Sequence, residues 1–137
     1  MKTFLSIKYH ANHNNRAQIE GITAALRLLG WETVCVTRDI EGWGERPLSP
    51  QQLMQATFAA IDKCDLLLVE LSEKGVGVGI EAGYAYGRNI PIVAIAPVGS
   101  DISTTLQGIA RQVIWYDTYE EIADCLSAML NHEDMKE

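Results

Sequence analysis

Hydrophobic positions along the chain follow two different periods. Short runs rich in apolar and β-branched residues predict strands at residues 3–7, 31–37, 65–71, 91–96 and 112–116. We expect helices between them, at residues 15–29, about 50–63, about 80–88 and about 118–130, with a short helix before the last strand. In the last helix Ile122, Leu126 and Met129 share one face, which predicts that they point inward.

Capping signals mark the helix ends. Ser49 is a suitable N-cap, Pro50 suits the first helical position, and Gln52 completes a capping box. Gly30 is expected to end the first helix. The nearly continuous apolar run at residues 65–71 is typical of a strand buried on both faces.

This alternation of strands and helices predicts an α/β fold. We expect one domain over residues 1–137, with a frayed tail at residues 131–137. The expected architecture is a flavodoxin-like or Rossmann-like three-layer sandwich with a five-stranded parallel sheet in the order 2-1-3-4-5. Ligands of such sheets bind beyond the carboxyl ends of the strands, which predicts a site formed by the loops at residues 8–14, 38–48, 72–80, 97–103 and 116–118.

Composition narrows the possible partners. The net charge of −7 argues against nucleic acid, whose backbone requires a basic face. No apolar run reaches the roughly 20 residues of a membrane span. The three cysteines form no CxxC pair, so we expect neither a zinc site nor disulfides, and the predicted location is the cytoplasm.

The stretch GVGVGIEAGYAYG, residues 75–87, carries the candidate chemistry. Gly77-x-Gly79-x-x-Ala82 matches a dinucleotide-binding fingerprint, but it follows the third strand, and Glu81 lies where a pyrophosphate would bind. Like charges about 4 Å apart repel by roughly 1–4 kcal/mol. Glu81 is either an ordinary acid in the first helical turn or a carboxylate held ionised by the helix dipole and directed into the cleft. The second interpretation suits a nucleophile or the stabilisation of an oxocarbenium-like sugar.

Residues 65–95 resemble the nucleoside 2-deoxyribosyltransferase superfamily, most closely its 2′-deoxynucleoside 5′-monophosphate N-glycosidases. The matching positions are Asp65, Gly77, Gly79, Glu81, Gly83 and Ala85. The segments SIK at residues 6–8 and ISTTLQG at residues 102–108 are similar to two further family segments, so the resemblance covers about residues 3–130. It implies an enzyme in which Glu81 attacks the anomeric carbon of the sugar, forming a covalent intermediate that water or a second base resolves.

The resemblance also implies a substrate site without metal or cofactor. Ser6, Lys8 and Ser103 match the positions that hold the 5′-phosphate, with Ser103 supplied across a homodimer interface. From the residues alone, these three are a strand-end hydroxyl, a solvated lysine and a helix N-cap. Gly77 and Gly79 would let the sugar approach. Gly75 stands where this branch tends to have a serine.

A second position, besides Gly75, departs from the family pattern. Thr57 occupies the place of the aspartate that usually assists departure of the base, and a hydroxyl cannot act as a general acid near neutral pH. His10, His13 or Asp39 could supply a substitute acid. Tyr9 could stack on the base or cover the sheet edge. Trp43, in EGWGE, could line the base pocket as part of a mobile lid or pack its loop down.

The expected function is cleavage of the N-glycosidic bond of a nucleoside or deoxynucleoside 5′-monophosphate, by hydrolysis or base transfer. The expected partner is a small nucleotide or nucleoside. Two alternatives stay open. Thr57 favours a non-catalytic nucleotide-binding or sensing domain, and a glutamate at the position of Glu81 would also suit a TIR-like enzyme that cleaves NAD.

Overall fold

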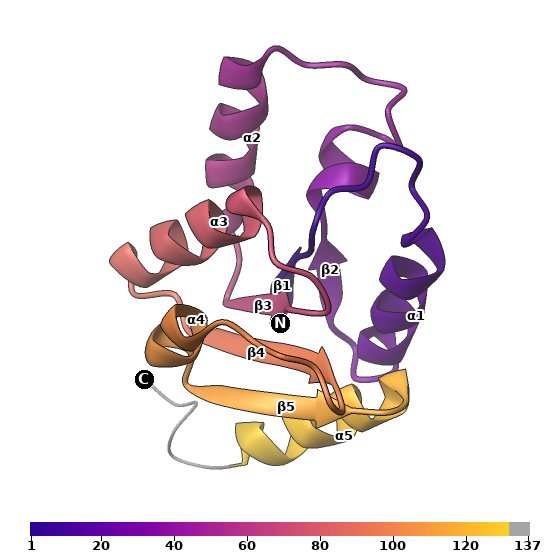
Figure 1. Cartoon of the computed structure of the whole chain (residues 1–137), viewed down its shortest axis with the longest axis vertical. Helices are drawn as coiled ribbons and strands as arrows, with labels where there is room; N and C mark the ends of the chain where they lie inside the picture. The colour runs from indigo at the N-terminus through magenta and orange to yellow at the C-terminus, as the bar shows by residue number, and fades with distance from the viewer. Residues whose placement is uncertain (132–137) are drawn as a thin grey trace.

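The computed structural model describes residues 1–131, so most of the predicted frayed tail, residues 132–137, lies outside the described part. The elements are β1 (Lys2–Ser6), α1 (Arg16–Arg27), β2 (Glu32–Val34), the π-helical turn η1 (Val36–Ile40), α2 (Pro50–Asp62), β3 (Leu66–Glu70), α3 (Val76–Gly87), β4 (Ile92–Pro97), α4 (Thr104–Ile109), β5 (Gln112–Tyr116) and α5 (Tyr119–Leu130). The strands form a parallel sheet in the order β2-β1-β3-β4-β5 (Figure 1), which confirms the predicted topology.

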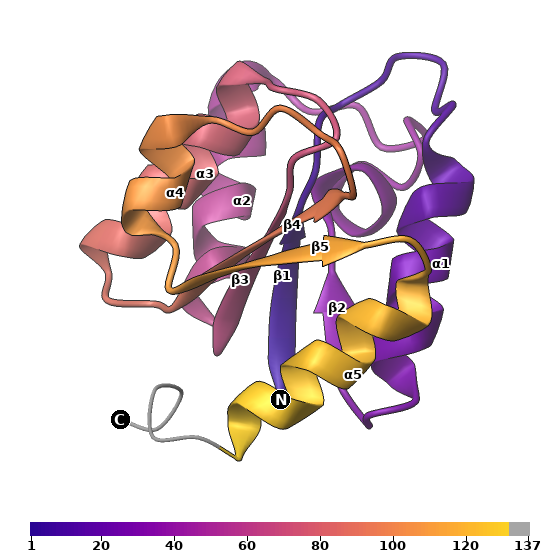
Figure 2. The ribbon, with the colours of Figure 1, turned by 60° about the horizontal axis from the view of Figure 1, so that its bottom comes forward.

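Helices cover both faces of the sheet (Figure 2). On one face α1 and α5 pack, with Ile122, Leu126 and Met129 buried as predicted. On the other face α2, α3 and α4 pack against alternate strand residues such as Phe4 and Leu67. Every residue of β3 is buried, as its continuous apolar run predicts. No helix within residues 1–131 has the length and apolar character required to cross a bilayer.

The capping box of α2 forms as the sequence predicts. Gln52 donates its backbone N–H to Ser49 Oγ at 3.1 Å, and Ser49 donates its own to Gln52 Oε1 at 3.0 Å. Such caps contribute about 1 kcal/mol. They fix where α2 begins, and α2 is the helix that forms one wall of the cleft described below.

The second strand is shorter than the predicted range 31–37. The ladder ends at Val34, and η1 follows. Cys35 donates its backbone N–H to Asp39 Oδ2 at 2.8 Å, and its carbonyl accepts from the N–H of Asp39 at 2.8 Å. Because β2 is an edge strand, Cys35 satisfies its polar groups within the turn instead of extending the sheet.

The third helix begins earlier than predicted, at Val76 instead of near Ile80. The glycine-rich stretch is therefore helical and not a loop, with Gly75 as an extended N-cap residue. Glycine costs about 1 kcal/mol per residue in a helix relative to alanine, which is why local propensity favoured a loop. Burial of Val78 and Ala82 against the sheet outweighs this cost.

Candidate active site

A cleft of about 330 Å³ opens at the carboxyl edge of the sheet. Its walls come from α2, from the N-terminal end of α3 and from the segments that follow β1 and β2. The lining residues are Ile7, Lys8, Tyr9, Val36, Thr37, Glu41, Leu53, Met54, Thr57, Gly75, Val76, Gly77, Val78 and Glu81. The predicted residues Lys8, Tyr9, Thr57, Gly75, Gly77 and Glu81 are thus brought together, at the edge of the sheet that the topology predicted.

Glu81 is buried in the wall of this cleft, with 9% of its surface exposed. The Ser6 hydroxyl, at the end of β1, donates a hydrogen bond to Glu81 Oε1 at 2.5 Å. Burial raises the pKa of Glu81 to about 7, although the Ser6 hydrogen bond acts in the opposite direction. The largest influence on this carboxyl group is therefore burial, which favours its protonated form, and not the helix dipole. Glu81 lies in the second turn of α3, beyond the range in which the dipole is strong.

The N-terminal end of α3 also lines the cleft. Gly75 precedes the helix and has no side chain that could cap the N–H groups of the first turn. These N–H groups are unpaired in any α-helix that lacks a cap, and they attract anions. A Cβ on Gly77 would meet no other atom within 4 Å, so the backbone there is open to a ligand. Gly79 is equally open but is not among the lining residues.

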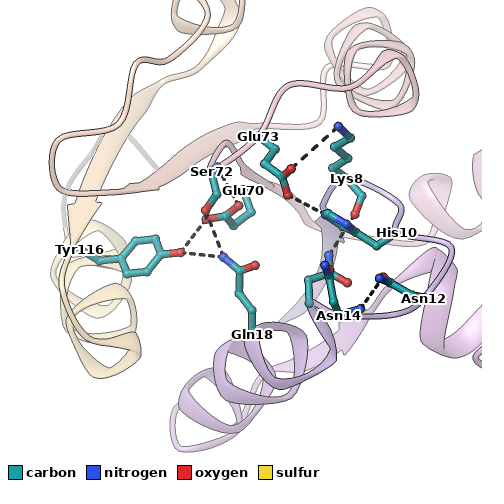
Figure 3. A network of polar contacts seen from close by, with 10 residues as sticks. Lys8, His10, Asn12, Asn14, Gln18, Glu70, Ser72, Glu73 and Tyr116 are labelled. Atoms are coloured by element: carbon teal, nitrogen blue, oxygen red, sulfur yellow. Dashed lines mark hydrogen bonds and ion pairs between the residues drawn. The ribbon is translucent and has the colours of Figure 1, made fainter.

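The segment after β1 is tied to the loop after β3 (Figure 3). Lys8 Nζ lies 3.9 Å from Glu73 Oε2, and His10 Nε2 lies 2.6 Å from Glu73 Oε1. Asn15 donates its side-chain amide to the Lys8 carbonyl at 3.0 Å. These contacts hold Lys8 at the cleft and direct His10 away from it, so His10 is not placed to protonate a ligand there.

A second polar network holds the start of the same loop (Figure 3). The buried Glu70 carboxylate accepts hydrogen bonds from the Ser72 backbone at 2.9 Å, the Ser72 hydroxyl at 2.6 Å and the Tyr116 hydroxyl at 2.6 Å. Gln18 donates to both hydroxyls. Burial and the Glu70 carboxylate raise the pKa of Tyr116. The network links β3, β5 and α1 beneath the segment that leads into α3, and no sequence motif indicated it.

Thr57 forms part of the α2 wall, beside Leu53 and Met54. Its side chain is buried, and its hydroxyl donates to the Leu53 carbonyl at 2.8 Å. The hydroxyl proton is therefore engaged within the helix. This arrangement leaves Thr57 only its oxygen lone pairs for a ligand and supports the sequence-based view that it cannot supply a proton.

The other two predicted substitute acids lie outside the cleft. Asp39 accepts from Arg38 at 2.8 Å in addition to the Cys35 amide. The His13 ring packs edge-on against Trp43 with centroids 5.7 Å apart. Arg16 lies 4.3 Å above the same indole. Trp43 therefore packs its loop against the start of α1, and it does not line the cleft.

Of two further predicted site residues, Ser103 lies outside the cleft and Tyr9 lines it. Ser103 is the N-cap of α4, where its hydroxyl accepts from the Leu106 N–H at 3.3 Å, and it does not line the cleft of its own chain. Tyr9 lines the cleft with 56% of its surface exposed, so its ring is accessible to a ligand.

Glu41 is a cleft residue that sequence reasoning missed. It follows η1, is half-buried and lines the cleft together with Glu81. Several acidic residues lie in the loop after the second strand, and nothing in the sequence showed that Glu41 and not Asp39 would line the cleft. Among residues 1–131 no group of three or more histidine, cysteine or acidic side chains is arranged to hold a metal ion.

Comparison with known proteins places the chain among enzymes that act on nucleotides. No family model matches. A protein of Syntrophotalea carbinolica is 35% identical over 126 residues, which cover 90% of this chain and 88% of that protein. A protein of Thermofilum pendens is 23% identical over 95% of each. Both are named "Putative 2'-deoxynucleoside 5'-phosphate N-hydrolase 1".

Solved structures show the same fold. A CMP N-glycosidase of Clostridium botulinum superposes with a TM-score of 0.67 at 20% identity, covering 94% of this chain and 99% of that one. A 2-deoxyribosyltransferase of Bacillus psychrosaccharolyticus superposes with a TM-score of 0.73 at 14% identity, covering 90% and 91%.

Proposed function

Because the chain belongs to the 2′-deoxynucleoside 5′-phosphate N-hydrolases of the nucleoside 2-deoxyribosyltransferase superfamily, we propose that it cleaves the N-glycosidic bond of a nucleoside 5′-monophosphate. Glu81 is the proposed nucleophile. The observation that carries this assignment is a buried carboxylate in the cleft wall, held by Ser6 and close to a helix N-terminus that suits a phosphate.

The proposed reaction has two steps. One oxygen of Glu81 forms a bond to the anomeric carbon as the glycosidic bond breaks, and the bonding electron pair leaves with the base. Ser6 occupies Oε1, and within residues 1–131 no hydrogen bond occupies Oε2, so Oε2 is the proposed attacking atom. A water oxygen then bonds to the anomeric carbon as the bond to the Glu81 carboxylate breaks, and the proton lost by the water neutralises the base anion released in the first step. In a transferase a second base would replace water.

The phosphate subsite is proposed at the start of α3. Unpaired N–H groups of the first turn and the Lys8 ammonium are the suitable donors. Ser6 is better assigned as a positioning residue for Glu81 than as a phosphate ligand, because its hydroxyl proton is already directed at the carboxylate. Tyr9 is the proposed cover of the bound nucleotide, since its ring is exposed at the cleft.

Base release tests the proposal directly. The purified protein is incubated with 5′-monophosphates of both ribose and deoxyribose, and free base is followed by chromatography. We expect release by the wild type and by Glu120→Ala, a control on the exposed first turn of α5, and none by Glu81→Ala. Equal release by Glu81→Ala would overturn the nucleophile. A glycosyl adduct on Glu81 in intact-mass spectra would support the covalent step, and a new nucleotide formed from an added base would identify transfer.

A second candidate is a non-catalytic nucleotide sensor. Two observations favour it: Thr57 uses its proton within α2, and His10, His13 and Asp39 all lie away from the cleft. Thermal stabilisation by a monophosphate without any release of base would support the sensor. NAD belongs in the same panel, because release of nicotinamide would identify an NAD-cleaving enzyme instead.

The predicted homodimer remains a proposal, and the outer face of α3 supports it. Val76 is 82% exposed, Ile80 47% and Tyr86 58%. Glycines separate them, and a Cβ on Gly83 would meet nothing within 4 Å, so a second helix could approach closely. Sedimentation should give a dimer for the wild type and a smaller species for Ile80→Lys.

Sharing of residues between subunits has its own test. If Ser103 acts across the interface, mixing inactive Glu81→Ala with impaired Ser103→Ala should recover activity, because mixed dimers contain one intact site. If the subunits are shown to exchange and the mixture is no more active than the two variants measured separately, this arrangement is contradicted.

A further inference from the structure

Glu41 faces the cleft with an unused carboxylate. Its backbone is held on both sides: its N–H donates to the Val36 carbonyl at 2.9 Å, and its carbonyl accepts from Gly44 and Arg46, each at 3.0 Å. The side chain, by contrast, forms no hydrogen bond or ion pair with any residue in the range 1–131. A hydrogen-bonded backbone that presents a free carboxylate to a cavity is suited to ligand recognition.

The cations near Glu41 already have partners. Arg38 contacts Asp39, Thr23 and the Thr33 carbonyl, and Arg46 donates to the Asp39 carbonyl at 2.8 Å. Arg16 lies over Trp43. Lys8, the cation that lines the cleft, comes from the segment after β1 and pairs with Glu73. The Glu41 carboxylate is thus available to accept hydrogen bonds from a bound molecule.

If a nucleotide binds as proposed above, the order of the strands places Glu41 at its base end. Three segments lie side by side along the carboxyl edge of the sheet, in the spatial order of their strands β2, β1 and β3. They are η1, which follows β2, the segment with Lys8, which follows β1, and the start of α3, which follows β3. If the phosphate lies between Lys8 and α3, with the sugar at Glu81, the base extends toward η1 and α2. The remaining lining residues there are largely apolar, namely Val36, Leu53 and Met54, as a planar base requires.

We propose that Glu41 selects nucleobases that carry an exocyclic amino group, such as cytosine and adenine, over thymine and uracil. This inference rests on the proposed function. An ionised carboxylate only accepts hydrogen bonds, so it pairs with the amino group of cytosine. Uracil presents a carbonyl oxygen at the same position, and two acceptors facing each other leave both unpaired in a partly desolvated cleft.

The closest test compares dCMP with dUMP, which differ in this edge alone. We expect the wild type to favour dCMP in kcat/KM by at least about tenfold, the size of one good base contact. In Glu41→Gln the preference should fall toward unity, because an amide can donate as well as accept. Glu45→Gln removes the same charge from an exposed position of the same loop and should retain the preference. A wild type without preference, or a Glu41→Gln variant that keeps it, would overturn the inference.

Binding separates this inference from the proposed function. The ratio of dissociation constants for dCMP and dUMP can be measured on Glu81→Gln, with and without Glu41→Gln, where no turnover is needed. If the wild type releases no base but the binding ratio collapses on Glu41→Gln, recognition stands and the hydrolase fails. If bases are released and the ratio does not move, the hydrolase stands and the assignment of Glu41 fails.

Discussion

Ser6 and Glu81 join the end of β1 to the second turn of α3 through a hydrogen bond of 2.5 Å. The bond links two segments of the sheet edge and orients the carboxylate that lies in the cleft wall. It also opposes the effect of burial on the pKa of Glu81. Several measurable consequences arise from this pair and from its surroundings.

Base release by the wild type should depend on pH through Glu81. A nucleophilic carboxylate must be ionised, and its pKa in the folded protein is about 7. We therefore expect kcat/KM to rise about tenfold per pH unit below pH 7 and to level off above it. The measurement is kcat/KM for a monophosphate between pH 5 and 9. A profile that is flat from pH 5 to 7 would contradict the assigned ionisation.

Ser6→Ala should shift this profile toward higher pH. The hydroxyl lowers the pKa of Glu81, so its removal leaves the effect of burial unopposed. Hydrogen bonds to charged groups contribute about 1.5–3 kcal/mol, which corresponds to a shift of roughly 1–2 pH units. Ser127→Ala, on the exposed face of α5, is the matched control. If Ser6→Ala lowers the plateau without moving the midpoint, Ser6 acts on the substrate and not through Glu81.

The stability of the protein should also depend on Glu81. Its pKa is raised in the folded state relative to the unfolded state, so the folded state binds the proton more tightly. The contribution is most favourable below about pH 4.5 and is lost as the pH rises to about 7. A shift of this size corresponds to on the order of 3 kcal/mol.

Glu81→Gln removes this dependence, because the amide does not titrate. Its melting temperature should exceed that of the wild type by several degrees at pH 8 and match it near pH 5. Glu120→Gln changes an exposed carboxylate. Its melting temperature should change between pH 5 and pH 8 by the same amount as that of the wild type. Equal melting temperatures of wild type and Glu81→Gln at pH 8 would mean that Glu81 is not significantly desolvated.

Thr57→Asp should increase base release and decrease stability. The new carboxylate would lie in the cleft wall, where it could assist the departing base or activate water. It would also face the Leu53 carbonyl without a proton to donate, which costs about 1–3 kcal/mol. Thr57→Asn has nearly the same shape but cannot exchange protons at neutral pH. If Asn increases kcat as much as Asp does, the gain comes from shape and not from acid–base chemistry.

Most element types could be predicted because their signals are local. The Ser49–Gln52 capping box and the apolar run of β3 depend on residues a few positions apart. The start of α3 could not be predicted in the same way. Gly77 and Gly79 favour a loop by propensity, and only the burial of Val78 and Ala82 against the sheet makes the segment helical.

The candidate site could be predicted in part. A parallel sheet brings the carboxyl ends of its strands to one edge, so the sequence alone places Lys8, Tyr9 and Glu81 together. The sequence did not show which acidic residue of the segment after β2 lines the cleft. Asp39 is occupied by Arg38 and by the Cys35 amide, whereas Glu41 is the acid of that segment that reaches the cleft.

The amino-acid order was sufficient for the strand order and for locating Glu81 at the carboxyl edge of the sheet, because hydrophobic periodicity and the rules of parallel sheets are properties of short segments and their succession. The ionisation of Glu81 and the identity of the second acid in the cleft required the folded chain. Both depend on desolvation and on contacts between segments that are distant in sequence, such as β1 with α3 and η1 with α2.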